Sequence, residues 1–220
     1  RYHVPAQKTK DFISSYTEKN VKVLSYWYDG DVWKPADKRA CRSQLGLPDD
    51  KFIVGSFQRD TEGSDLITPK LEKGPDIFCD YVEKLNKDRD VHVLLGGWRR
   101  QYVINRLNEA NIPHTYFELA PLEQLRQMYG SCDLYVVGSR HEGGPQSILE
   151  AAAMKTPIIS TDVGIASTVL SPNCVFDITS KLYVPTDDDV TDCFNRVQGF
   201  ELRSYAQKYL DLFQEMIEGK

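Results

Sequence analysis

The feature that most constrains the fold is an alternation of short, β-rich apolar runs with segments of helical periodicity along nearly the whole chain. The apolar runs are continuous, which indicates strands buried on both faces of a sheet. They are VKVLSYW (21–27), FIVGSF (52–57), VHVLLGG (91–97), HTYFEL (114–119), DLYVVGS (133–139), TPIIST (156–161) and CVFDI (174–178). Strands that alternate with helices favour right-handed βαβ crossovers, so the sequence predicts a single doubly wound, Rossmann-like, three-layer α/β domain with a parallel sheet.

Helices are expected between these runs, and the clearest is PDIFCDYVEKLNK, where Pro75 stands at the first helical position. After Asp187 two helical segments follow with no further strand, whereas residues 1–20 are polar and fit no strand. The expected helices are 36–45, 75–87, 99–111, 121–130, 145–155, 188–200 and 201–219. These patterns divide the chain into 1–20, a linker or remnant of a preceding domain; 21–186, the sheet domain; and 187–220, helices that pack on it or cross to a neighbouring domain.

Composition excludes several classes of protein. The 27 basic residues against 32 acidic ones give a net charge of −5, so no one-signed basic surface is available for nucleic acid. The apolar runs are strand-sized, so neither a membrane span nor a signal peptide is expected. Five cysteines without a CxxC pair indicate reduced, packed thiols of a cytoplasmic protein. The chain does not begin with methionine, which is consistent with a processed product or with a piece of something longer.

Ligands of an open parallel sheet bind where strands end at their carboxyl edge, so the loops after the strands are the places to search. Arg59 follows the run 52–57, and Lys73 stands just before the helix that starts at Pro75. Two cations beside free backbone amides would trap a pair of phosphates. The alternative is that both are solvated surface charges.

A second loop, after 133–139, reads Arg-His-Glu-Gly-Gly-Pro-Gln and leads into a helix. Its glycines allow close approach of a ligand, and the helix start aims amides at an anion. Within that helix, Glu150 lies among residues that are apolar on every side, and a buried carboxylate needs a partner. A Glu favoured by the helix dipole and exposed through a gap in the packing is equally compatible with the pattern.

Two further loops, 96–100 and 162–165, also follow strands, but neither is diagnostic. The four histidines show no metal-ligand spacing, so no metal site is expected. The glycine fingerprints GxGxxG and GxxxxGK[ST] are both absent after the strands, which makes a dehydrogenase less compatible with the chain.

Taken together, the run EGGPQSILE, with SFQRD and EKG upstream, SCDLYVVGSRHEGG before it and AAAMKTPIISTDVG behind it, resembles the carboxy-terminal donor-binding half of a GT-B glycosyltransferase. More narrowly, it is similar to the large retaining family 4, which uses nucleotide-diphosphate sugars. The resemblance covers about residues 21–215. It implies a UDP- or GDP-sugar as substrate, no cofactor and no metal, and a role in the biosynthesis of a polysaccharide or glycoconjugate.

The resemblance also implies roles for residues. Arg59 and Lys73 would neutralise the donor diphosphate, and with Glu142, beside the sugar ring, they would form the catalytic set. Glu150 would accept hydrogen bonds from the ribose hydroxyls. The backbone of 117–122 would edge the base. The remaining donor-binding residues implied are Gly143, Gly144, Pro145, Gln146 and Leu122.

In such an enzyme the cations stabilise the charge that develops on the leaving diphosphate, and the anomeric configuration is retained. The acceptor would be held by an amino-terminal domain missing from this chain, and the full-length protein could associate peripherally with the cytoplasmic face of a membrane. Three departures from the family pattern stand out: Gly-Pro-Gln after the first Glu-Gly, Gly-Ile-Ala-Ser at 164–167, and a longer loop between Arg59 and Lys73 that would order on binding. The alternatives are a nucleotide-sugar-binding module without turnover and a sugar-nucleotide epimerase of the same architecture.

Overall fold

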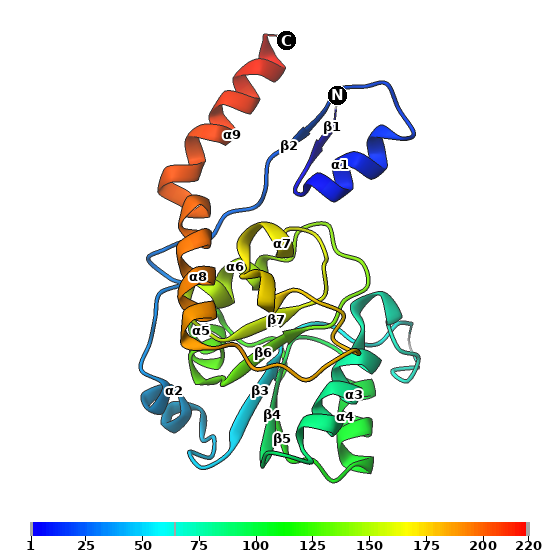
Figure 1. Ribbon diagram of the computed structural model, residues 1–220, viewed down its shortest axis with the longest axis vertical. Coiled ribbons are helices and arrows are strands. Elements are labelled where there is room, and N and C mark those ends of the chain that lie inside the picture. Colours follow the sequence, from blue (N-terminus) through cyan, green and yellow to red (C-terminus); the bar gives the residue numbers. More distant parts are fainter. Residues whose placement is uncertain (1, 64, 219–220) are drawn as a thin grey trace.

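The computed structural model describes residues 2–63 and 65–218, and its centre is a five-stranded parallel sheet with helices on both faces (Figure 1). The strand order is β5-β4-β3-β6-β7, and Val54 of the central strand lies opposite Val93 on one side and Leu134 on the other. This confirms the doubly wound α/β prediction. The strands are β3 (Phe52–Ser56), β4 (Val91–Gly96), β5 (His114–Phe117), β6 (Leu134–Val137) and β7 (Ile158–Ser160).

The crossover helices follow the expected pattern. Pro75 opens α3, whose inner face carries Phe78 and Val82, while Asp37 caps α2 and Gly46 ends it in the left-handed conformation. The helices are α2 (Lys38–Leu45), α3 (Pro75–Leu85), α4 (Gln101–Glu109), α5 (Leu122–Ser131), α6 (Gln146–Ala153) and α7 (Ala166–Val169), with 3-10 turns η1 (Leu71–Lys73), η2 (Pro172–Cys174) and η3 (Gln198–Phe200). They build one apolar core on each face of the sheet. All five cysteines are buried and free, as predicted.

The expectation that residues 1–20 contain no strand is wrong. β1 (Tyr2–Val4) pairs in parallel with β2 (Val21–Val23), and α1 (Gln7–Ser14) connects the two strands. The run 21–27 was expected to be a strand of the main sheet; instead β2 ends at Val23 and belongs to this separate two-stranded sheet. The pattern hid the pairing because β1 buries only Val4, so its strand conformation depends on hydrogen bonds with β2.

A second correction concerns the expected strand 174–178. The 3-10 turn η2, which Pro172 favours, ends at Cys174, and after it only a single bridge joins Val175 to Ser160. Cys174 and Ile178 are both buried, but in the cores on opposite faces of the sheet. The run is apolar because it passes from one core to the other.

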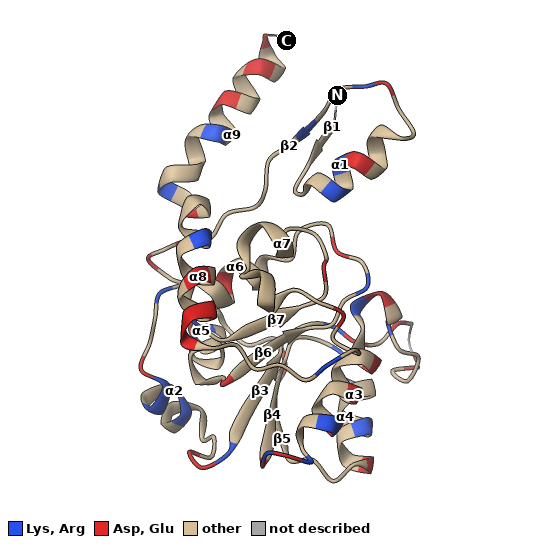
Figure 2. Cartoon of the chain, viewed as in Figure 1, with Lys and Arg blue, Asp and Glu red and all other residues tan. Residues whose placement is uncertain are grey.

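Two α-helices form the C-terminal part of the described chain. α8 (Asp187–Val197) lies against α6, and acidic residues gather at its start, where Thr186 and Asp189 form a capping box (Figure 2). α9 (Leu202–Ile217) then leaves the main sheet and runs alongside β2 (Figure 1). The Tyr209 hydroxyl donates to the Ser25 carbonyl at 2.9 Å. No helix in the described part of the chain is both long and apolar enough for a membrane span.

Candidate functional site

The candidate site lies at the topological switch point of the sheet. β3 is flanked by β4 on one side and β6 on the other, so the loops after β3 and β6 leave the same edge side by side. They touch at Gly74, which has a φ of 60° and where an added Cβ would lie 1.8 Å from the Gly138 carbonyl oxygen. Only glycine fits there, because both the conformation and the backbone contact exclude a side chain.

A hollow of about 550 Å³ opens at this edge. Its walls come from η1, from the loops after β6 and β7, and from α1. The lining residues are Lys8, Thr9, Phe12, Lys70, Glu72, Lys73, Arg140, His141, Glu142, Gly143, Asp162, Val163 and Gly164. Three of the residues selected from the sequence, Lys73, Glu142 and Gly143, therefore meet in one cavity.

Lys73 and Glu142 form the charged centre of the hollow. The Lys73 ammonium lies 2.6 Å from Oε1 of Glu142, and the buried Ser139 hydroxyl donates to the same oxygen at 2.9 Å. The Gln58 amide donates to the Lys73 carbonyl at 2.7 Å, which fixes the backbone of the lysine. The Lys73 side chain is 28 % exposed, so it can reach a ligand.

The rim of the hollow is held by further polar contacts. Arg140 forks onto both Asp76 oxygens, at 2.8 and 2.6 Å, and this hydrogen bonding lowers the Asp76 pKa. The backbone amides of Arg140 and His141 both donate to the Glu72 carbonyl. The loop after β6 is thus tied to η1 and to the start of α3.

Arg59 lies outside the wall of this hollow. Its Nε donates to the Thr61 carbonyl at 2.7 Å, and its guanidinium lies 5.2 Å from the ring centre of Trp98. The next residue, Asp60, forms a fully buried ion pair with Arg100, with 2.9 Å between Nε and Oδ2. This pair anchors the start of the loop to β4 and α4. The structure does not bring Arg59 and Lys73 together.

The glycine loop before α6 packs closely on its surroundings. A Cβ on Gly144 would lie 2.8 Å from Pro5, and one on Gly164 would lie 2.7 Å from Pro145 and 3.1 Å from the Gly143 carbonyl. Pro145 is extended and precedes the first residue of α6, Gln146, which is exposed. The loops after β6 and β7 and the N-terminal segment therefore meet at this turn.

Glu150 occupies α6 among buried apolar neighbours, as its sequence surroundings indicated. Its partner is Tyr129 of α5, whose hydroxyl donates to Oε2 at 3.0 Å. Burial raises the pKa of Glu150 to about 7, and the hydrogen bond from Tyr129 opposes this effect. The carboxylate therefore titrates near neutral pH.

Two more placements complete the comparison with the sequence. Leu122 is exposed at the start of α5 and lines a different hollow of about 460 Å³, with Asp31 and Arg126. Its role stays a prediction, as does that of Arg59. Lys8 and Phe12 also line the hollow but were not predicted from the sequence. They lie four residues apart, so they share one face of α1. This helical spacing could have indicated α1, but the segment was interpreted as a polar linker.

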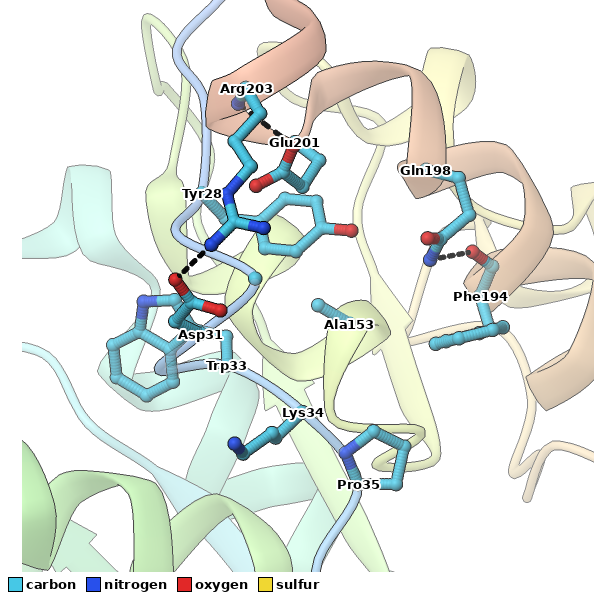
Figure 3. A pocket seen from close by; sticks show the side chains of 11 residues that line it. Tyr28, Asp31, Trp33, Lys34, Pro35, Ala153, Phe194, Gln198, Glu201 and Arg203 are labelled. Carbon is cyan, nitrogen blue, oxygen red and sulfur yellow. Dashed lines mark hydrogen bonds and ion pairs between the residues drawn. The ribbon is translucent and has the colours of Figure 1, made fainter.

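A further hollow of about 300 Å³ lies where the chain after β2 passes under the C-terminal helices (Figure 3). Arg203 of α9 reaches Asp31 across it, while the backbones of Tyr28 and Glu201 form a parallel bridge. The Glu201 carboxylate caps α9 by accepting from the Arg203 amide at 2.8 Å. These contacts hold the start of α9 against the segment that follows β2, so the residues around this hollow have a structural role.

Among the residues described, no three His, Cys, Asp or Glu side chains gather in a way that could hold a metal ion. The charged groups available for a ligand in the hollow are therefore those of Lys73, Glu142 and their neighbours on the rim.

The sequence pattern of the family “Glycosyl transferases group 1” matches residues 65–198, more than half of the chain and nearly all of the switch-point site. The chain belongs to this family. A D-inositol 3-phosphate glycosyltransferase of Nocardia farcinica is 31 % identical over 179 residues, which cover 75 % of this chain and 38 % of the relative. The chain spans less than half the length of the curated relatives it matches.

Solved structures share the fold. HepE of Anabaena, in complex with UDP and glucose, superposes with a TM-score of 0.76 at 17 % identity, covering 97 % of this chain and 62 % of that one. Sucrose-phosphate synthase from Thermosynechococcus elongatus gives 0.73 at 18 % identity, covering 99 % and 58 %. The family 4-like GT-B resemblance stated from the sequence is confirmed at the level of family and fold.

Proposed function

We propose that this chain is the donor-binding part of a retaining glycosyltransferase that uses a UDP- or GDP-sugar. The observation that carries the proposal is the Lys73–Glu142 pair in a cavity at the switch point of a group 1 glycosyl transferase fold. The complex of HepE with UDP and glucose supports a uridine nucleotide as the first donor to test.

In this proposal each residue binds a different part of the donor. The Lys73 ammonium meets the diphosphate, together with amides at the start of α6. Glu142 lies beside the sugar, and Glu150 accepts from the ribose. Arg59 adds a second cation after its guanidinium turns away from Trp98, since its loop leaves the same sheet edge as Lys73.

The reaction breaks the bond between the anomeric carbon and a phosphate oxygen and forms a bond from that carbon to an acceptor oxygen on the same face. The acceptor's hydroxyl proton leaves with the diphosphate. Negative charge grows on the diphosphate as the first bond breaks, and preorganised cations and amides stabilise it most in the transition state. Because Lys73 and Arg59 supply this positive charge, we propose that the reaction needs no bound metal.

A second domain would complete the enzyme. Large apolar side chains remain exposed on α1, just after α1 and on α9, on either side of the two-stranded sheet, which is too small to be stable alone (Figure 1). They are Phe12, Tyr16, Leu210, Phe213, Met216 and Ile217. We propose that an amino-terminal acceptor-binding domain covers this surface and closes the hollow on the side of Lys8.

The test compares Lys73→Ala with the control variant Lys51→Ala. Lys51 lies at the opposite edge of the sheet and forms an ion pair with Asp90. Lys73→Ala should weaken UDP or GDP binding by roughly 5- to 150-fold through lost charge-assisted contacts, while uridine or guanosine binding stays unchanged. Calorimetry measures both. Equal losses for nucleoside and nucleotide would show that Lys73 does not meet phosphate, and no nucleotide binding by the unaltered chain would contradict the proposal.

Turnover is tested with the same protein. The 220-residue chain should bind a labelled UDP- or GDP-sugar yet transfer no sugar to added acceptors, because the acceptor is not positioned and water reaches the anomeric carbon. Supplying the acceptor-binding domain in the same chain should restore transfer. Transfer by the chain alone would refute the division into two halves, and a full-length protein that binds donor without transfer would indicate a non-catalytic module.

A further inference from the structure

Tyr129 of α5 is almost completely buried and is surrounded by aromatic residues. Its ring centre lies 5.6 Å from that of Trp33, 4.9 Å from Phe57 and 5.1 Å from Tyr135, each in edge-to-face geometry. The residue is 1 % exposed. Three aromatic neighbours from three directions leave the ring a single orientation.

That orientation aims the Tyr129 hydroxyl at Glu150. The hydroxyl donates to Oε2 at 3.0 Å, and among the described residues Tyr129 is the only one that forms a hydrogen bond with this carboxylate. Glu150 is partly exposed, so its other oxygen, Oε1, remains for a ligand. A rigid donor from α5 thus fixes one half of a carboxylate presented by α6.

We propose that Tyr129 is a positioning residue that holds the Glu150 carboxylate so that its second oxygen can accept a hydrogen bond from the ribose of the donor. The inference rests on the function proposed above. It assigns to the buried hydroxyl a task in recognition beyond filling the core.

The charge state of Glu150 supports this assignment. Within the described residues, the titratable groups that interact with Glu150 are Tyr129 from α5 and Tyr135 from β6, and burial raises the pKa of both, to about 12 for Tyr135 and well above 10 for Tyr129. Both are neutral near pH 7, so neither compensates the carboxylate charge. The Tyr129 hydrogen bond favours the ionised form of Glu150 and thereby keeps it a stronger acceptor.

A purely structural Tyr129 would give different results from a positioning one. Loss of a core hydroxyl lowers stability but leaves the ligand's discrimination between ribose and deoxyribose unchanged. Loss of a positioning hydroxyl weakens the discrimination between ribose and deoxyribose. It also shifts the pH dependence of this discrimination to higher pH, because the Glu150 pKa rises when the hydrogen bond is removed. The affinity ratio of UDP to 2′-deoxy-UDP isolates both effects, since titration of the phosphates cancels in the ratio.

The experiment measures this ratio by calorimetry between pH 5.5 and 8.5 for the unaltered chain and three variants, with GDP and 2′-deoxy-GDP in parallel. Tyr129→Phe removes only the hydroxyl. Tyr81→Phe is the matched control: it removes a buried hydroxyl that donates to the Tyr183 carbonyl at 2.6 Å, in the core on the other face of the sheet. Glu150→Gln removes the charge.

In the unaltered chain and in Tyr81→Phe, the ratio should rise with pH around pH 7 as Glu150 ionises. In Tyr129→Phe it should fall roughly three- to tenfold at pH 7 and rise only at higher pH, and in Glu150→Gln it should not vary with pH. If Tyr129→Phe leaves the affinity ratio and the midpoint of its pH dependence unchanged while Glu150→Gln alters them, the role of Tyr129 is refuted but that of Glu150 is not. No ratio above one in the unaltered chain, or equal ratios in all four proteins, would instead overturn the proposed role of Glu150.

Discussion

Replacing Glu150 with Gln should stabilise the fold at alkaline pH while removing the carboxylate that we propose accepts from the ribose. The folded protein holds the Glu150 proton more tightly than the unfolded chain, because burial raises the pKa from 4.5 to about 7. Stability therefore falls as the pH rises from the unfolded pKa to the folded one, and it stays lower above it. Glutamine carries no proton to lose, so the variant escapes this decrease.

The magnitude follows from the size of the pKa change. At about 1.4 kcal/mol per pKa unit, a rise from 4.5 to about 7 corresponds to about 3 kcal/mol of lost stability above pH 8. At pH 5 the difference should be below about 1 kcal/mol, because the carboxyl is protonated in the folded state. The amide oxygen of Gln can still accept from Tyr129, so the core keeps its contact.

Urea unfolding at pH 5 and pH 8, followed by circular dichroism, gives the free energies of unfolding of both proteins. The difference between variant and parent is the relevant quantity, since titration of all other groups is common to both. Glu123→Gln is the control: this exposed glutamate of α5 lies 2.8 Å from Arg126, whose hydrogen bond lowers its pKa, so its replacement should not stabilise at pH 8. A Glu150→Gln difference that does not change between pH 5 and pH 8 would refute the reasoning.

Two further substitutions separate sugar recognition from scaffold integrity. Glu142→Ala should leave nucleoside-diphosphate affinity nearly unchanged and weaken only the intact nucleotide sugar, measured by calorimetry; a similar loss for both ligands would remove Glu142 from the sugar subsite. Asp60→Ala leaves Arg100 buried without its counter-ion and should cost about 3–5 kcal/mol in urea unfolding, and a loss below about 1 kcal/mol would show that the pair does not anchor the loop.

The strands of the main sheet could be predicted from the sequence because each is a continuous apolar run that alternates with helical segments. The candidate site followed, since parallel strands fix which loops share an edge. Lys73 and Glu142 lie 69 residues apart, yet this rule places both at the carboxyl edge of the sheet. Lys73 and Glu142 were predictable because the local sequence pattern and the parallel topology of the sheet both place their loops at the same edge.

Contacts that depend on side-chain orientation could not be predicted from the sequence. Arg59 follows the correct strand, but its guanidinium lies over Trp98, a residue of the loop after β4 that no spacing rule connects with it. The sequence predicted that Glu150 needs a partner if it is buried, but it did not identify that partner as Tyr129 of α5. The β1–β2 pair escaped detection because three-residue strands leave almost no periodic signal.

The pairing of charges in the hollow bears on how a donor would enter it. Lys73 is paired with Glu142, Lys70 with Glu72, and Lys8 with Asp162, so the cavity is close to neutral before a ligand arrives. A diphosphate must therefore compete with carboxylates for these ammonium groups. An ammonium has three donors and can keep one for Glu142 while turning the others to phosphate, which a planar guanidinium locked in a fork could do less readily. In the proposed function, lysine at position 73 therefore suits a site that shares its charge between Glu142 and the donor diphosphate.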